Sequence, residues 1–557
     1  MPRPKGRREM PAVNVFPGKV RPQLARPGGG ARRPGRLMRA VWSLALAMVS
    51  DLAQPPAPLV LYDDEEETAE EARMPFGEKV ARRACTMCHT FVEPNLLTKQ
   101  NWAEQILPRM SVRLGVARPD YSSSPEGDLI RARKIYTDKP LVPVDWWPAI
   151  EQYYLQNAPA DPLPQDPRPE IQIGLPGFRT EPPRFRTPDP ATTLVKISPG
   201  RRQIFAGDDQ LKALFILNTN GAFEARLDAG NVPVDLVETE AGIYVTCVGS
   251  FLPSEIHRAE LLFFPKQTGG FGERRVILKE LPRSVQAEFA DFNGDGRQDF
   301  ALCMFGNLTG RFSWFENLGQ DQYREHVLSR ETGAMYCAAR DFDGDGKVDL
   351  AVLFAQHLES LIVMYGDGRG NFSGDSVFQK PPVYGHSFME AVDFNGDGRL
   401  DFVVTNGDNG EYESPTKKYH GVWLYLARGP REYEEKFLFP LNGAYRALAR
   451  DFDGDGDLDI AVNSYFPDYV KSPRECFVLL QNQGGLRFAP FTFRECISGR
   501  WLVMDAGDLD GDGDLDIVLG SYIHGPAPAP RFLMNIWERQ GPSVQILRNT
   551  LKDPPGS

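Results

Sequence analysis

Short apolar segments recur along the second half of the chain, each directly after the same acidic nine-residue pattern. The pattern begins at residues 291, 341, 393, 451 and 508, so neighbouring copies start 50 to 58 residues apart. The apolar segment that follows, such as DLAVLF, predicts a buried strand, and a second stretch such as Ser360–Phe378 predicts a hairpin with a glycine-containing corner. Repeats of this length indicate stacked units, and strand, loop, strand and hairpin make one four-stranded propeller blade.

The acidic pattern itself, for example DFDGDGDLD from Asp451, predicts a calcium-binding loop. Positions 1, 3, 5 and 9 carry side-chain oxygens, position 7 offers its backbone carbonyl, and glycines at positions 4 and 6 permit a tight turn. Oxygen ligands without His or Cys favour calcium over zinc or copper. An EF-hand needs Glu at position 12, where every copy has Leu or Val, so that class is excluded.

We expect about five calcium ions with a structural role, each joining one strand to the next. The candidate ligands, with position 7 acting through its backbone, are Asp291, Asn293, Asp295, Arg297 and Asp299; Asp341, Asp343, Asp345, Lys347 and Asp349; Asp393, Asn395, Asp397, Arg399 and Asp401; Asp451, Asp453, Asp455, Asp457 and Asp459; and Asp508, Asp510, Asp512, Asp514 and Asp516. At position 7 only the backbone carbonyl is needed, so the side chains of Arg297, Lys347 and Arg399 can point outward.

These repeats resemble the FG-GAP/VCBS repeats of integrin-alpha-type β-propellers, over about residues 195–548. Two earlier segments, Arg201–Leu217 and Asp235–Phe251, have the strand pattern without the acidic loop, and Ile243–Val248 aligns with the strand that follows each loop. Two such blades and five calcium blades predict a seven-bladed propeller over residues 193–548, which is within the usual range for this architecture.

Charge is distributed unevenly along the 557 residues, whose formal net charge is −12. Residues 1–54 carry eleven Lys and Arg against Glu9 and Asp51, and the remainder is strongly acidic. An acidic surface argues against nucleic acid as a partner.

The amino-terminal part predicts export from the cytoplasm. Residues 1–37 are rich in Pro, Gly and Arg and are expected to be a disordered basic extension. Residues 38–55 predict a signal peptide, because the apolar run Ala40–Val49 follows Met38 and Arg39 and is too short to span a bilayer. Translation starting at Met38 and a long basic extension are both compatible with this pattern. Residues 56–71 form an acidic spacer, and no membrane span is expected after signal removal.

Cys85, Cys88 and His89 form the C-x-x-C-H pattern of covalent haem attachment. The two thiols can form thioethers to a haem c, and the adjacent imidazole can bind its iron. A zinc site would need further Cys or His ligands nearby, and the next are Cys247 and His257, so that site is excluded. A thioredoxin-like pair would need a βαβ context that this segment lacks.

The flanks of the motif predict a small all-α cytochrome c domain over residues 72–160. Helices are expected over Pro75–Cys88 and Val144–Asn157, the latter with Trp147, Ile150 and Tyr154 on one face. Pro108 is expected to end a helix over Asn101–Leu107 and to leave Met110 in a loop, where its sulfur could be the sixth iron ligand. A packing methionine and an open iron are the alternatives. The segment from Cys85 to Gly115 also resembles the cytochrome c region found ahead of VCBS repeats in some bacterial secreted proteins.

Residues 161–192 form a proline-rich linker, either a tether or a strap across the propeller. Cys476 and Cys496 flank one hairpin and could pair in an oxidising compartment. The other propeller cysteines are expected to be buried thiols, and the six histidines after His89 lie singly, without ligand spacing. No nucleophile elbow, phosphate loop or paired-acid signature is present.

Three functions are compatible with the sequence. The first is a secreted or periplasmic monohaem cytochrome that transfers electrons with a redox protein or a small molecule, its propeller serving as scaffold or docking module. The second is a haem-dependent oxidoreductase with a substrate site in the propeller. The third is an adhesion or ligand-binding propeller with an accessory haem. No catalytic residue can be named, because no substrate pocket is evident from the sequence.

Overall fold

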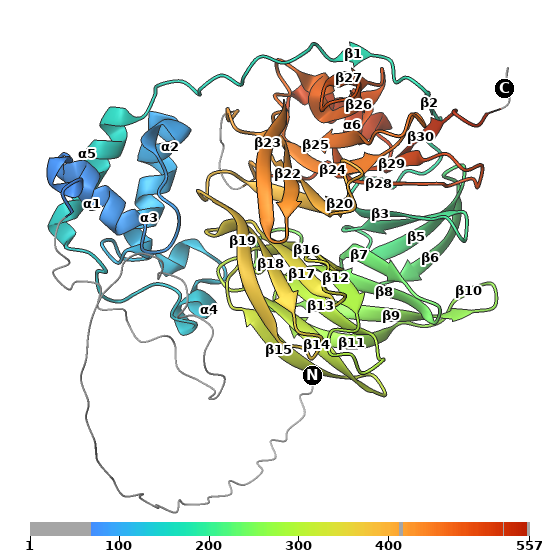
Figure 1. The fold of residues 1–557 in the computed structure, drawn as a ribbon, viewed down its shortest axis with the longest axis horizontal. Coiled ribbons are helices and arrows are strands. Elements are labelled where there is room, and N and C mark those ends of the chain that lie inside the picture. Colours follow the sequence, from blue (N-terminus) through green and yellow to red (C-terminus); the bar gives the residue numbers. More distant parts are fainter. Residues whose placement is uncertain (1–67, 411–415, 527–528, 554–557) are drawn as a thin grey trace, which may run out of the picture. The chain divides into compact units, whose positions relative to one another are not determined.

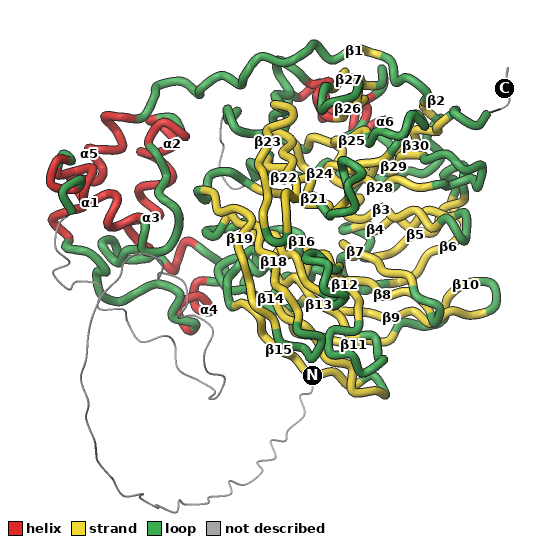
Figure 2. The backbone as a smooth tube through the Cα atoms, viewed as in Figure 1, coloured by secondary structure: helices red, strands yellow, loops and turns green. Residues whose placement is uncertain are grey.

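The computed structural model describes residues 68–410, 416–526 and 529–553, which belong to one compact unit. The predicted basic extension, the predicted signal peptide and most of the acidic spacer lie outside the described residues. Helices make up the first described part of the chain and strands make up most of the rest (Figure 1, Figure 2). No helix in the described ranges is long and apolar enough to cross a membrane.

The helical part contains α1 (Phe76–Cys85), α2 (Lys99–Asn101), α3 (Leu107–Arg113), α4 (Gly127–Ala132) and α5 (Trp147–Asn157). A π-helical stretch, Trp102–Ile106, joins α2 to α3 without a break. The expectation that Pro108 ends the helix is therefore wrong, and Met110 lies within α3. Proline is tolerated near the start of a helical segment, and here it occupies the first turn of α3.

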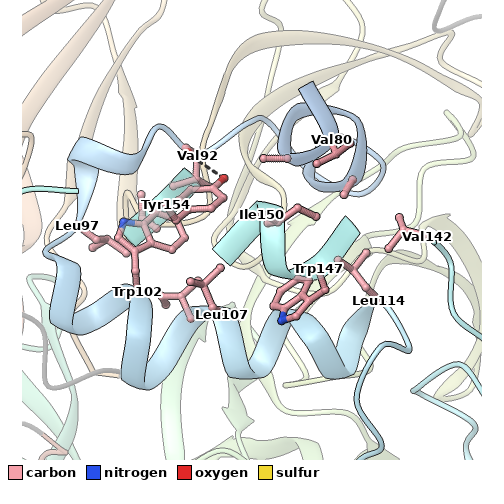
Figure 3. Close-up of a cluster of buried hydrophobic side chains, with 14 of the residues drawn as sticks. Val80, Val92, Leu97, Trp102, Leu107, Leu114, Val142, Trp147, Ile150 and Tyr154 are labelled. Carbon is pink, nitrogen blue, oxygen red and sulfur yellow. Dashed lines mark hydrogen bonds between the residues drawn. The ribbon is translucent and has the colours of Figure 1, made fainter. Parts of the chain in front are cut away.

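Large apolar side chains from these helices form one core (Figure 3). Trp147, Ile150 and Tyr154 are buried along one face of α5, as their spacing predicts. The Tyr154 hydroxyl donates to the carbonyl oxygen of Val92 at 3.0 Å, so this buried phenol is satisfied. Trp102 packs on Tyr154 with ring centroids 4.1 Å apart. The same cluster includes Val383 and Tyr419 from the strand-rich part of the chain, so the helical region shares its core with that part.

The strands form seven sheets, which confirms the predicted seven-bladed propeller. In chain order the blades are β3 (Thr192–Ser198), β4 (Gln203–Asp208), β5 (Ala213–Asn218) and β6 (Phe223–Asp228); β7 (Pro233–Glu238), β8 (Gly242–Cys247), β9 (Ala259–Gln267), β10 (Gly270–Phe271) and β11 (Arg275–Leu281); β12 (Ser284–Ala290), β13 (Asp299–Met304), β14 (Arg311–Gly319) and β15 (Gln322–Ser329); β16 (Ala334–Arg340), β17 (Asp349–Phe354), β18 (Glu359–Gly366) and β19 (Phe372–Lys380); β20 (His386–Val392), β21 (Asp401–Asn406), β22 (Gly421–Gly429) and β23 (Glu432–Pro440); β24 (Ala444–Arg450), β25 (Asp459–Ser464), β26 (Phe477–Asn482) and β27 (Phe488–Thr492); and β28 (Trp501–Gly507), β29 (Asp516–Ser521) and β30 (Val544–Asn549).

The first strands of successive blades pack on one another, and β28 of the seventh blade contacts β3 of the first, which closes the ring. The second strand of every blade from the third to the seventh is buried along its whole length. These are the apolar segments that follow the acidic loops, and their continuous burial explains why they do not alternate with polar residues. A helix, α6 (Arg531–Gln540), lies between β29 and β30.

The proline-rich linker is a strap. Its strand β1 (Gln172–Ile173) pairs in parallel with β27 of the sixth blade. Its strand β2 (Phe178–Thr180) pairs antiparallel with β30 and supplies the fourth strand of the seventh blade. The seventh blade is thus completed by residues that precede the first blade in sequence, and it would otherwise have three strands.

Candidate metal loops and haem-attachment motif

Each acidic loop connects the first and second strands of a blade, from the third blade to the seventh. In three loops the carboxylates at positions 1, 3 and 5 each bring one oxygen to within 4.8 Å of the others; these are Asp341, Asp343 and Asp345; Asp451, Asp453 and Asp455; and Asp508, Asp510 and Asp512. The other two loops have Asn293 and Asn395 at position 3, where an amide oxygen can replace the carboxylate.

Backbone amides fold around the first aspartate of the loop. Asp341 accepts from the amides of Gly344 at 2.7 Å and of Gly346 at 2.8 Å. Both glycines have positive φ, 79° and 81°, which lets the chain turn this tightly. The turn predicted from the glycine spacing is confirmed.

The aspartate at position 9 also joins two strands through the backbone. Asp349 is fully buried and accepts from the amide of Phe342 at 2.9 Å and from that of Gly366, on the third strand, at 2.8 Å. Burial raises the pKa of all five position-9 carboxyls, to about 7 for Asp459 and for Asp516. Position 9 therefore holds the blade together in addition to its predicted role as a ligand.

The basic side chains at position 7 are exposed, and each pairs with a carboxylate of its own loop. Lys347 Nζ lies 2.6 Å from Asp345, and Arg297 and Arg399 pair in the same way with the position-5 carboxylates of their loops. The hydrogen bond from Lys347 lowers the pKa of Asp345. In these three loops the positive charge of a Lys or Arg side chain thus compensates part of the acidic charge.

The seventh-blade loop contains unsatisfied carboxylate oxygens. Asp510 and Asp514 each bury one oxygen that has no hydrogen-bond partner among the described residues. Arg548 reaches the loop, 3.1 Å from Asp510 and 2.6 Å from the position-9 residue Asp516. A buried carboxylate oxygen without a partner is costly, and a bound cation would satisfy it.

The predicted haem-attachment motif lies at the end of α1. Cys85 is the last residue of this helix, and Cys88 lies in the turn that follows, so the helix is shorter than predicted. Both are free thiols, and the Tyr154 hydroxyl oxygen lies 3.7 Å from Cys85 Sγ. Burial raises the pKa of Cys85 to about 11 and also raises that of Cys88. Cys85 packs against the helical core, as do Met87 and Met110.

His89 is oriented for binding through one ring nitrogen. Its Nδ1 lies 2.9 Å from the carbonyl oxygen of Thr90, which fixes Nδ1 as the protonated nitrogen. No hydrogen bond from Nε2 to a described residue is present. Burial is the main cause of the lowered pKa of His89, so the imidazole is neutral, the form in which it binds metals. Hydrogen bonding of one nitrogen to a carbonyl is the usual way a ligating histidine is held.

The propeller places a Glu–His pair beside this motif. Glu331 and His357 are 2.8 Å apart, and their charges influence Cys88 and His89 respectively, after the larger effect of burial. The helical region is also tied to the propeller by Arg133, which donates to Glu255 at 3.2 Å and to Thr309 at 2.9 Å. These contacts join positions that lie far apart in the sequence, so sequence reasoning did not find them.

Two further groups of cysteines and histidines lie close together in the propeller. Cys476 and Cys496 are free thiols here, and Cys476 Sγ donates to the carbonyl oxygen of Cys496 at 3.2 Å, so the two residues are neighbours. His386 is buried and lies 2.5 Å from the buried Glu359. His420 is buried nearby, with neither ring nitrogen hydrogen-bonded to a described residue.

Comparison with known families agrees with the repeat pattern. The model of the FG-GAP-like repeat matches residues 291–352, 341–404, 393–462 and 451–519, each match running from one acidic loop through the strand after the next. No curated protein matches the sequence significantly. Similar solved structures include the BBS1N domain in complex with ARL6DN (9% identity, 68% of this chain and 98% of that chain, TM-score 0.41) and the Dos1 propeller (8%, 64% and 76%, TM-score 0.39). Because these TM-scores are low, the number of blades is taken from the strand pairing of this protein alone. Residues 291–519 are FG-GAP-like repeats within a seven-bladed β-propeller.

Proposed function

We propose that this protein is a monohaem c-type cytochrome whose haem-bearing helical domain is carried by a calcium-stabilised propeller. The observation that carries the proposal is the state of His89, with Nδ1 bonded to a carbonyl and Nε2 available, next to two thiols at the end of a helix. Cys85 and Cys88 would form the thioethers and His89 would bind the iron. A haem held in this way supplies a one-electron redox centre.

The residues around the motif fit such a group. The apolar core that packs against Cys85 and Met87 would exclude water from one edge of the porphyrin, and the Thr90 carbonyl would keep the imidazole in the required tautomer. Met110 packs against the same core and is the candidate sixth ligand. The Tyr154 hydroxyl would hold the Cys85 sulfur in place.

Variants of the two cysteines test this proposal. The full chain is expressed with a cytochrome c maturation system and run on a denaturing gel stained for haem peroxidase activity. Wild type should stain, and Cys85→Ala with Cys88→Ala should not. The matched control is Cys476→Ala with Cys496→Ala, two cysteines of the propeller, which should keep the stain. Haem staining in the Cys85 and Cys88 variant would contradict covalent attachment at this motif.

The same proposal includes export to the periplasm or the cell exterior, because haem is attached outside the bacterial cytoplasm. It also includes calcium ions bound at the five acidic loops. The partner would be a redox protein or a small-molecule electron donor or acceptor. The acidic charge of the propeller loops disfavours nucleic acid.

A second candidate function is a haem-dependent oxidoreductase, favoured by the Glu331–His357 pair beside the motif. In that case the Glu331–His357 pair would accept a proton from a substrate, and the electrons of that substrate would reduce the haem. A donor that reduces wild-type haem several-fold faster than the haem of a His357→Gln variant, at an unchanged potential, would support the enzyme. Equal rates with every donor would leave the electron carrier as the function.

A further inference from the structure

A cavity of about 310 Å³ lies where the fifth blade meets the helical region and the strap. This volume is at the lower end of the range for small-molecule sites, enough for one or two rings. Four aromatic residues of the fifth blade, Tyr384, Tyr419, Trp423 and Phe437, line one side, and Leu96, Leu97 and Leu163 contribute to the other. The site is separate from the acidic loops and the cysteine motif.

The aromatic side chains are paired with one another. Tyr384 stacks on Tyr419 with centroids 4.3 Å apart and planes 17° apart. Trp423 packs on Phe437 at 4.4 Å. Such pairs hold each ring in one orientation, so the cavity presents fixed flat surfaces, which favour a flat ligand.

Most polar groups that line the cavity already have partners. Trp423 Nε1 donates to Asn406 at 2.9 Å, and the Tyr419 hydroxyl and Lys417 Nζ both donate to the carbonyl oxygen of Val383 at 3.0 Å. Lys418 pairs with Asp166 at 3.3 Å. A sugar, which needs many hydrogen bonds, would find few groups available, so the cavity suits an apolar molecule.

The Tyr384 hydroxyl is available to a ligand. Among the described residues the Tyr384 hydroxyl has no hydrogen-bond partner, and this residue lines the cavity. Burial raises the pKa of Tyr384, so its phenol stays protonated and can donate at neutral pH. Asn95 and Thr416 are the other lining side chains without a partner in the described ranges, and Asn95 is exposed.

We propose that this cavity binds a planar aromatic molecule that carries one hydroxyl group, of the phenol or naphthol class. The ligand ring lies against the aromatic side of the cavity, and its oxygen accepts from the Tyr384 hydroxyl. The inference does not depend on haem, because it uses only residues of the fifth blade, the strap and the 95–98 segment.

The test is equilibrium dialysis of the full chain against 2-naphthol and against decahydro-2-naphthol, which has the same carbon skeleton without aromaticity. We expect one naphthol per chain, bound about tenfold more tightly than the saturated alcohol, since aromatic contacts contribute beyond buried area. Tyr384→Phe should weaken naphthol binding several-fold through loss of the hydrogen bond.

Two further variants locate the site. Leu163→Trp fills the cavity from the strap and should weaken naphthol binding at least tenfold. Leu211→Trp is the matched control, since both leucines are 37% exposed and Leu211 lies outside the cavity. Both substitutions place a larger side chain at a half-exposed position, so neither disturbs the core. Equal binding of the two alcohols, no binding of either, or unchanged naphthol affinity in Leu163→Trp would overturn the proposal.

Discussion

Replacing Asp455 by Asn should change stability in opposite directions with and without calcium. Asp455 occupies position 5 of the sixth-blade loop, and its carboxylate accepts from the amide of Asp457 at 2.9 Å. Asparagine keeps that acceptor but removes one charge. Without calcium the variant should be more stable than wild type, because its loop is less repulsive. With calcium it should be less stable, because the ion loses a charged ligand.

The magnitude follows from the loop geometry. Oxygens of Asp451, Asp453 and Asp455 lie within 4.8 Å of one another. Two unit charges at that distance in water repel by about 0.9 kcal/mol, so removing one of three charges removes two such repulsions and relieves about 1 kcal/mol once salt screening is considered. Calcium at 100 times its dissociation constant adds about 2.7 kcal/mol per site, which is the most that the variant can lose.

The assay is thermal unfolding of the propeller, in millimolar calcium and in excess chelator. We expect a melting temperature a few degrees below wild type in calcium and slightly above it in chelator. Asp453→Asn is the control, because two natural loops have Asn293 and Asn395 at this position, so its loss in calcium should be smaller. A shift of the same sign in both buffers for Asp455→Asn would refute the view that these loops bind calcium.

Three further predictions follow from the structure. If Met110 binds the iron, the weak near-infrared band of ferric methionine ligation should be present and should vanish in Met110→Ala; a band that survives would mean another ligand. Phe178→Ala, which removes the contact at 5.8 Å between strap and Phe452, should destabilise the propeller by about 1–3 kcal/mol, whereas Phe532→Ala at a 54% exposed site should have little effect. Chelation should lower the melting temperature more at about pH 8 than at about pH 5.5. Burial raises the pKa of Asp459 and of Asp516 to about 7, so below that pH both carboxyls are protonated in the folded protein. In the absence of an ion, the stability that this protonation provides is lost as the pH rises through 7. An equal effect of the chelator at both pH values would contradict this reasoning.

The sequence predicted the blades because each repeat is defined by local chemistry. The glycines and acidic residues of one loop fix a turn, and the apolar run that follows fixes a buried strand, so five blades could be located from nine-residue patterns. The two blades without acidic loops could be counted because their segments have the same strand pattern, and Ile243–Val248 lies at the repeat spacing from the equivalent strand of the next blade. The position of β8 confirms that alignment.

Contacts between distant parts of the chain were not predictable. The strand β2 has three residues, no recognisable pattern and a partner more than 350 residues away. The pairing of Lys347 with Asp345 depends on side-chain conformation, and Met110 lies in a helix because a π-helical stretch carries the chain past Pro108. Glu359, His386 and His420 are separated in sequence and meet only because adjacent blades place them together.

The most direct test of the central proposal is the intact mass of the purified full chain after expression with a cytochrome c maturation system. The account predicts a mass increase of one haem over the polypeptide, mapped by proteolysis to the peptide that contains Cys85 and Cys88, with neither thiol open to alkylation. An unmodified mass, with both cysteines alkylated after unfolding, would contradict it.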